Sequence, residues 1–165
     1  GKPIVLGVED YNHNGPTQTL PTTETQILND GAGPFTNTVY ALPNSAGGIL
    51  DTVNNEFNFP DGGAGLGDVV NVRINATIQT FGTSTTVTCG LRMAVGGSSY
   101  DLVSAEQWFK KVGTHDFTHE ISVYMGDLNT LNNPAQVIMK SDDPATVVDL
   151  AGWAITIHKR SPVYE

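Results

Sequence analysis

The chain has 165 residues, and its eight Lys and Arg against seventeen Asp and Glu leave a net charge of -9. A chain of this length is expected to form one domain. The acidic balance argues against nucleic-acid backbones and anionic membrane surfaces as partners, because both are bound through Lys and Arg. We therefore expect no nucleic-acid partner and no membrane partner.

Neutral residues supply much of the polar surface, with nineteen Thr and thirteen Asn in the chain. Thr favours strands and Asn favours turns, so the composition predicts a β-rich chain with many loops. Cys89 is the single cysteine, which excludes an intrachain disulfide. The sequence also has no apolar run of the roughly 18 residues that a membrane-spanning helix needs.

Residues 1–25 hold a short apolar run followed by a segment rich in Gly, Pro, Asn and Thr. The run, residues 4–8, is either an edge strand or an arm that docks on a partner. Unattached termini are usually poorly ordered, so we expect the segment to lie against another surface. A chain that begins with Gly fits either a Met-processed free-standing protein or a trimmed fragment. We predict an extended arm over 1–25 whose partner-binding side chains are Ile4, Val5, Leu6, Val8 and Tyr11.

Short strands separated by clusters of Gly, Pro, Asn and Asp follow the arm. The pattern predicts strands at 26–28, 36–42, 49–54 and 56–59, then a Gly-rich loop at 60–67.

The longest regular pattern runs from residue 68 to residue 95. Apolar and polar residues alternate along both of its arms, and 82–84 is a Gly-containing turn. Successive side chains of a strand point to opposite faces, so two such arms joined by a short turn predict a β-hairpin with one buried side. Arg73 and Arg92 lie on the polar faces, either as ordinary solvated side chains or as partners for acidic groups of a neighbouring subunit.

Strands continue to the end of the chain. The pattern predicts strands at 100–103, 116–125, 135–140, 145–148 and 152–159, with a helical turn at 104–111 and a long loop at 126–134. Because no helix of normal length interrupts them, we predict an all-β antiparallel sandwich or jelly roll in a single domain, residues 26–165.

The patterns that could carry catalysis or bind metal each have a plainer structural explanation. The glycines at 62–67 precede a strand and lack the helix N-terminus that a phosphate-binding loop needs. His115 and His119 are four residues apart on a predicted strand, roughly 13 Å, which is too far for one ion. Cys89 lies in an apolar register with no adjacent base. The loop carboxylates lack calcium-loop spacing and suit Asx turns; they are Asp127, Asp142, Asp143 and Asp149.

We therefore expect no enzyme, no cofactor and no metal. A glycan hydrolase with paired carboxylates is the remaining enzymatic alternative, and it would lose activity when one loop carboxylate is replaced.

Turn and strand stretches follow a particular order from residue 26 onward. The first stretches are Asn-Asp-Gly-Ala-Gly-Pro-Phe-Thr-Asn-Thr at 29–38 and Phe-Asn-Phe at 57–59, which leads into Leu-Gly-Asp-Val-Val-Asn-Val-Arg at 66–73. Next come Gly-Thr-His at 113–115 and Tyr-Met-Gly-Asp-Leu-Asn-Thr at 124–130 with Asn-Asn-Pro-Ala at 132–135. The last are Lys-Ser-Asp-Asp at 140–143 and Gly-Trp at 152–153. In this order they resemble a module of tailed-bacteriophage virion proteins, which occurs in small capsid-decoration proteins and at the ends of fibre proteins. The resemblance implies a TNF-like jelly roll and carries no catalytic residues.

The first hypothesis is a structural virion protein, a capsid decoration (cement) protein that binds the outer surface of a phage head as a homotrimer and stabilises it. Its partner there is expected to be the major capsid protein or another virion protein. Trimer contacts are expected from apolar side chains left over once the core is filled. The candidates are Trp108, Phe109, Tyr124 and Trp153.

The alternative is the receptor-binding tip of a phage fibre that recognises a host glycan. Carbohydrate sites combine exposed aromatic rings with nearby Asp and Asn, and the candidates are Tyr100, Trp108, Asp127 and Asn129. A fibre tip belongs to a longer polypeptide with a repetitive stalk upstream, so the length of the natural open reading frame separates the two hypotheses.

Overall fold

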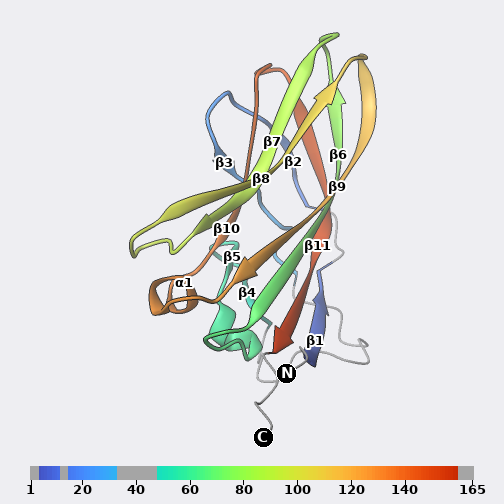
Figure 1. Ribbon diagram of the computed structural model, residues 1–165. Coiled ribbons are helices and arrows are strands. Elements are labelled where there is room, and N and C mark those ends of the chain that lie inside the picture. The colour runs from blue at the N-terminus through green and yellow to red at the C-terminus, as the bar shows by residue number, and fades with distance from the viewer. Residues whose placement is uncertain (1–3, 12–14, 33–47, 160–165) are drawn as a thin grey trace, which may run out of the picture.

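The computed structural model describes residues 4–11, 15–32 and 48–159, which form two antiparallel β-sheets packed face to face (Figure 1). The elements in chain order are β1 (Ile4–Asp10), β2 (Thr17–Thr19), β3 (Thr25–Gln26), β4 (Leu50–Asp51), β5 (Glu56–Phe57), the 3-10 helix η1 (Phe59–Gly62), β6 (Val69–Thr80), β7 (Thr85–Met93), β8 (Tyr100–Phe109), β9 (Gly113–Tyr124), α1 (Leu128–Asn132), β10 (Gln136–Ser141) and β11 (Val147–Lys159). The predicted all-β sandwich is confirmed. No helix in the described ranges is long and apolar enough to cross a membrane.

The strand order is that of a jelly roll. One sheet has the order β1-β11-β6-β9, with β2 also pairing with β11, and the other has the order β3-β10-β7-β8. Successive long strands therefore pass repeatedly from one sheet to the other, and β4 and β5 form a separate small hairpin. We call these the five-stranded sheet and the four-stranded sheet.

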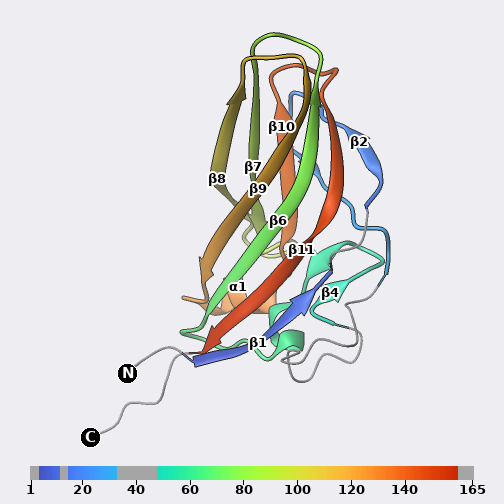
Figure 2. The ribbon, with the colours of Figure 1, turned by 90° about the vertical axis from the view of Figure 1, so that its right-hand side faces the viewer.

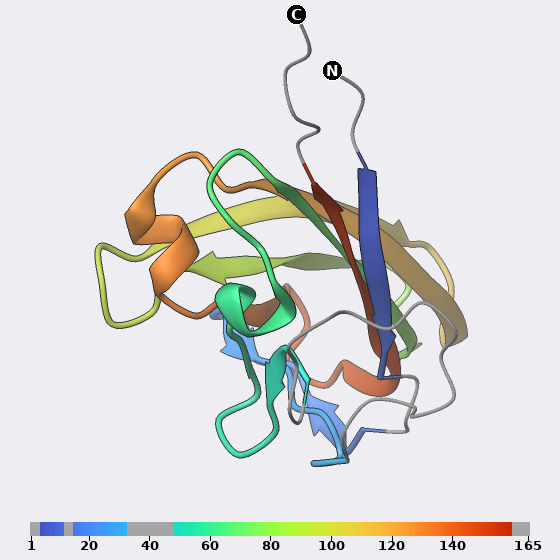
Figure 3. The same ribbon diagram turned by 90° about the horizontal axis from the view of Figure 1, so that it is seen from below.

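The sandwich is tall and has two distinct ends (Figure 2). The turn end carries the connections at 81–84, 110–112 and 142–146. The terminal end carries η1, α1, the start of β1 and the end of β11. β1 and β11 meet there, where Ile4 pairs with Lys159. Seen from below, η1 and α1 lie side by side at this end (Figure 3).

The predicted hairpin at 68–95 is wrong in its pairing, although both of its strands form. β6 pairs with β11 and β9 in one sheet, whereas β7 pairs with β10 and β8 in the other. The turn at 81–84 therefore crosses between sheets, and the apolar faces of β6 and β7 meet across the core. Alternation shows which face of a strand is buried but not which strand lies beside it, so a hairpin and a sheet-crossing connection give the same pattern.

The core between the sheets is filled by large apolar side chains. Trp153 and Phe57 are both buried, with their rings edge to face and the ring centroids 5.4 Å apart. Phe117, Ile74 and Leu91 are also fully buried. Each such side chain stabilises the fold by about 1.5–3 kcal/mol relative to an exposed one.

The helical turn predicted at 104–111 is wrong, because residues 104–109 belong to β8, which pairs with β7. A β-bulge opposite Cys89 and Gly90 inserts one extra residue into β8 and resets its alternation. Phe109 consequently points into the core and Trp108 points out. Helical structure occurs instead in two segments predicted mainly as loops. Asp127 is the N-cap of α1, and its carboxylate accepts a hydrogen bond from the backbone N–H of Thr130 at 2.8 Å. η1 has Pro60 in its first turn.

The described part of residues 1–25 lies within the sandwich. β1 is an edge strand paired with β11. An edge strand was one of the two alternatives given for residues 4–8. β2 also pairs with β11, and β3 pairs with β10. Tyr11 is fully buried, and its hydroxyl donates a 2.7 Å hydrogen bond to the buried Glu9 carboxylate. Burial raises the pKa of Tyr11 far above its usual range. The strand predicted at 36–42 lies outside the described residues.

Candidate functional site

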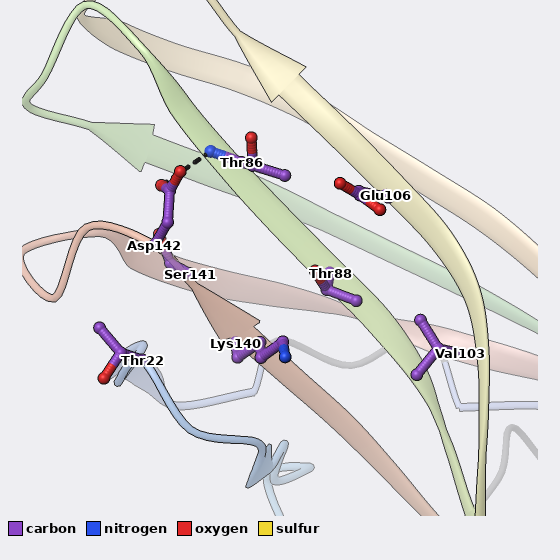
Figure 4. A pocket seen from close by; sticks show the side chains of 8 residues that line it. All are labelled: Thr22, Thr86, Thr88, Val103, Glu106, Lys140, Ser141 and Asp142. Atoms are coloured by element: carbon purple, nitrogen blue, oxygen red, sulfur yellow. Dashed lines mark hydrogen bonds between the residues drawn. The ribbon is translucent and has the colours of Figure 1, made fainter.

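A polar groove of about 670 Å³ crosses the outer face of the four-stranded sheet in its turn-end half (Figure 4). Side chains from β7, β8 and β10 line it together with the loops at 20–24 and 141–146. The lining residues are Thr22, Thr86, Thr88, Val103, Glu106, Lys140, Ser141 and Asp142. Volumes of about 300–1,000 Å³ are typical of small-molecule binding sites.

The bulge in β8 shapes this groove. A Cβ atom on Gly90 would lie only 2.2 Å from the backbone oxygen of Leu102, so β8 approaches β7 more closely at this point than any side chain would allow. A bulged strand bends and twists more strongly than a regular one. Beyond the bulge, Glu106 and Trp108 of β8 face outward beside Thr88 and Thr86 of β7.

The loops at the rim are held by specific hydrogen bonds. The Asp142 carboxylate accepts from the backbone N–H of Thr86 at 2.9 Å, and the Asp142 N–H donates to the Thr86 carbonyl at 3.1 Å. The Ser141 N–H donates to the Pro21 carbonyl at 3.0 Å, which places the loop carrying Thr22 beside β10. The rim of the groove is therefore preformed.

Two opposite charges face the groove across β7. Lys140 and Glu106 both pair with Thr88, one from each side, so their backbones are about 10 Å apart. Neither side chain makes a hydrogen bond or ion pair with another residue of the described ranges. Their hydrogen-bonding capacity is therefore available to a bound molecule.

Trp108 lies at the turn end of the groove, where it pairs with Thr86, and 59% of the residue is exposed. Its indole N–H donates to Ser84 Oγ at 2.9 Å, which fixes the ring in place. The Lys110 ammonium lies 4.6 Å from the ring centroid. Because Lys110 is an exposed, flexible side chain, this cation–π contact is weak enough to be displaced by a ligand.

An ion-pair cluster lies beyond the groove on the same face. The Arg92 guanidinium contacts Asp101 at 3.0 Å and Glu24 at 3.5 Å. Arg92 holds the pKa of Asp101 below its usual range, whereas a hydrogen bond with Asp101 raises the pKa of Glu24. This corrects the idea that Arg92 pairs with a neighbouring subunit, since its acidic partners are in its own chain. Arg73 is exposed on the five-stranded sheet, and its pairing stays a prediction.

Exposed apolar side chains also gather at the terminal end. Tyr124 is 64% exposed at the end of β9, where it pairs with Val69 of β6, and Val69 in turn pairs with His158 of β11. Leu66 and Leu128 are exposed in the adjoining loop and helix. The Gly67 N–H donates to the Met125 carbonyl at 2.9 Å, which joins the loop of Leu66 to the end of β9.

The four predicted interface residues are divided between core and surface. Trp153 and Phe109 are buried within a single chain, which corrects their assignment, because neither can present a surface to a second subunit. Trp108 and Tyr124 are exposed but lie at opposite ends of the sandwich. Their role in trimer contacts stays a prediction.

The predicted arm residues are likewise divided. Tyr11 is in the core, and Val8 lines a shallow hollow of about 270 Å³ on the five-stranded sheet. The side chains of Ile4, Val5 and Leu6 lie outside the described part of the structure. Partner binding by this segment stays a prediction.

The predicted glycan residues are brought together only in part. Tyr100, Asp127 and Asn129 all lie around α1, but they already hydrogen bond there: the Tyr100 hydroxyl lies 2.6 Å from Thr130 Oγ1, Asp127 caps the helix, and Asn129 bonds to the backbone of Ser98. Trp108 lies about 26 Å along β8 from Tyr100. These four residues do not form one site.

The plainer explanations of the catalytic and metal-binding patterns agree with the structure. His115 and His119 make separate hydrogen bonds, with Lys111 and Gln107 respectively. Cys89 is buried, and its burial raises the pKa of the thiol to about 12. The Asp143 carboxylate accepts from the Ala145 N–H at 3.0 Å, as an Asx turn does. No group of three or more His, Cys, Asp or Glu side chains in the described ranges is placed to hold a metal ion.

The groove itself was missed at the level of sequence. Thr86 and Thr88 were visible as outward positions of an alternating strand, but Glu106 fell in the segment predicted as a helical turn, and Lys140 lies more than fifty positions beyond Thr88. Only the pairing of β10, β7 and β8 places these residues on one face.

No protein-family model matches the chain, and no curated protein is similar to it in sequence. Solved structures with related folds include the CBM22-1 xylan-binding domain from Paenibacillus barcinonensis, with 9% identity, 97% of this chain and 98% of that chain covered, and a TM-score of 0.46. A second is the Eiger TNF from S. frugiperda, with 10% identity, 98% of this chain and 96% of that chain covered, and a TM-score of 0.44. A third is the top component of Cowpea mosaic virus, with 9% identity, 100% of this chain and 92% of that chain covered, and a TM-score of 0.37. Similarity at this level carries no inference about function.

Proposed function

We propose that this chain is a structural, non-enzymatic virion protein that decorates the outer surface of a phage head as a homotrimer and binds the major capsid protein. The ordered turn and strand stretches described above support the proposal, as does the jelly-roll strand order. The observation that carries it is the exposed apolar cluster at the terminal end, formed by Leu66, Tyr124 and Leu128. Exposed apolar side chains that gather in one place mark sites of protein association.

The terminal end is the attachment surface in this proposal. Tyr124 lies on the same row of paired strands as Val69, His158 and Val5, so the cluster adjoins the start of β1 and the end of β11. Capsid binding and subunit contacts are assigned to this end, and the turn end then faces away from the particle. Aromatic anchors surrounded by smaller apolar contacts are typical of the residues that dominate binding energy.

Immunogold labelling of the parent phage tests the location. Antibody against this chain is expected to label the whole head surface. Label confined to the tail tip would favour the fibre-tip alternative, and unlabelled virions would contradict both. Light scattering of the purified protein is expected to give three times the chain mass, whereas a monomer at micromolar concentration contradicts the trimer.

Charged substitutions separate the two ends. The double variant Tyr124→Asp/Leu128→Asp is expected to bind heads lacking this protein at least about tenfold more weakly, a loss of about 1.4 kcal/mol. The matched control, Phe81→Asp/Val112→Asp, places the same charges at exposed apolar positions of the turn end. Equal binding by the two variants would refute the assignment of the terminal end.

A further inference from the structure

We propose that the groove on the outer face of the four-stranded sheet binds a neutral oligosaccharide chain. This activity is additional to head decoration and depends on a different part of the molecule. The groove lies toward the turn end, away from the apolar cluster at the terminal end. A protein attached through its terminal end would leave this groove open to the surroundings.

The chemistry of the lining fits hydroxyl-rich ligands. Thr22, Thr86 and Thr88 offer hydroxyl groups that both donate and accept hydrogen bonds. Glu106 supplies an acceptor and Lys140 a donor on either side of Thr88. One hydroxyl group of a sugar ring can donate a hydrogen bond to the Glu106 carboxylate while a neighbouring hydroxyl group accepts one from the Lys140 ammonium. Both charged side chains would then gain a partner from the same ligand.

The exposed ring of Trp108 supplies the apolar part of the site. It lies two residues along β8 from Glu106, about 7 Å away on the same outward face. Aromatic rings carry large apolar surfaces that stack on the C–H face of a sugar. The hydrogen bond from its indole N–H to Ser84 holds the ring in position before any ligand arrives. In this arrangement one sugar ring stacks on the Trp108 indole while the next sugar ring contacts Glu106 and Lys140.

Charge favours a neutral ligand over the other classes. The chain carries a net charge of -9, which disfavours polyanions. Within the groove, Lys140 offsets one of the two acidic side chains of the lining, Glu106 and Asp142, so the lining itself carries little net charge. A protein partner needs about 1,000 Å² or more of complementary surface, usually with an apolar centre, whereas this groove is lined mainly by polar residues.

The test is a titration of the full chain with cellohexaose, maltohexaose and chitohexaose, with polygalacturonate as an anionic comparison. The chain has two tryptophans, and Trp153 is only 1% exposed. A ligand in the groove is therefore expected to change the fluorescence and the indole N–H resonance of Trp108 and to leave the Trp153 resonance in place. At least one neutral hexasaccharide is expected to bind with a dissociation constant of about 1 mM or tighter.

Two groove variants and a matched control locate the binding. Trp108→Ala and the double variant Glu106→Gln/Lys140→Ala are each expected to weaken binding at least about tenfold. The control, Glu120→Gln/Arg73→Ala, makes the same kind of charge changes at paired outward positions of the five-stranded sheet and is expected to bind within about twofold of the parent. Denaturation curves confirm that each variant is folded, and the double variant still tests the site if Trp108→Ala is unstable.

Three results would overturn the proposal. No response to any of the three neutral hexasaccharides at about 10 mM excludes the site. Equal losses in the groove variants and in the control place the binding elsewhere. Binding of polygalacturonate alone excludes the neutral class. None of these results affects the labelling of phage heads, so the two proposals fail independently.

Discussion

The outer faces of the two sheets are built from similar strands but differ in what their polar side chains do. Beside the hollow on the five-stranded sheet, some of these side chains bond to one another: Ser122 Oγ donates to Asn71 Oδ1 at 2.6 Å, and Asn71 Nδ2 lies 2.9 Å from His158 Nε2. On the four-stranded sheet, Glu106 and Lys140 face a larger hollow without such partners among the described residues.

The difference comes from the strand edges and loops rather than from the core. Both sheets bury alternating apolar side chains on their inner faces. Register shifts occur in both sheets, but the one beside Gly90 in the four-stranded sheet is accompanied by two rim loops tied to β7 and β10. A sheet face without such rims leaves only shallow hollows, whereas a bent edge strand together with raised rims makes a groove. The candidate binding surface is thus a local departure from regular structure on a shared scaffold.

Truncating a large side chain in the core should destabilise both sheets at once, because both pack on the same core. Trp153→Ala is expected to lower the free energy of unfolding by about 3–5 kcal/mol, because a fully buried indole leaves a large cavity. Trp108→Ala, at the other tryptophan, is expected to change it by no more than about 0.5 kcal/mol, because the ring is exposed. Urea denaturation measures both, and equal losses would contradict the contrast between core and surface.

A side chain added at Gly90, where β8 lies unusually close to β7, should affect the outer face of the four-stranded sheet more than that of the five-stranded sheet. Gly90→Ala is expected to cost about 1–3 kcal/mol, because its Cβ would overlap the Leu102 carbonyl and push β8 away from β7. Glycan binding should weaken in parallel. Gly65→Ala is the control, since its Cβ would meet only ordinary contacts at 3.7 Å and 3.8 Å. Unchanged stability and binding in Gly90→Ala would show that the bulge does not shape the groove.

Breaking a hydrogen bond on the five-stranded sheet should have a smaller effect. Ser122→Ala removes the donor to Asn71 and is expected to cost about 0.5–1 kcal/mol at most. Oligosaccharide titrations should be unchanged in this variant. A loss of binding comparable to that of the groove variants would contradict the separation of the two faces.

The smallest expected effect concerns His119, which joins the edges of the two sheets through a 3.2 Å contact between its Nε2 and Gln107 Oε1. Burial lowers the pKa of His119 below its ordinary value of 6.5. Below that ordinary value the unfolded chain takes up a proton more readily than the folded one, so the free energy of unfolding falls as the pH falls through this range. His119→Gln should remove this part of the pH dependence, which denaturation curves at about pH 7.5 and about pH 5.5 would reveal. Identical pH dependence in parent and variant would contradict the shift.

Strand positions were largely predictable because alternation is local. The apolar positions of β6, such as Val70 and Ile78, are buried as the pattern indicates. The Asx-turn explanation of Asp143 also depends on neighbours two residues apart. In contrast, Trp108 and Phe109 could not be assigned from sequence, since an extra residue elsewhere in β8 decides which of them points inward.

By itself, the sequence determined the fold class, the inward faces of the long strands and the turns between them, because these follow from the preferences of residues that are close in the chain. Tertiary structure alone decided that β6 and β7 lie in opposite sheets and that Lys140, Thr88 and Glu106 share one row. Strand pairing depends on contacts between distant segments across a common core, and side-chain alternation carries no record of the partner. The groove, and the function proposed for it, arises at that second level.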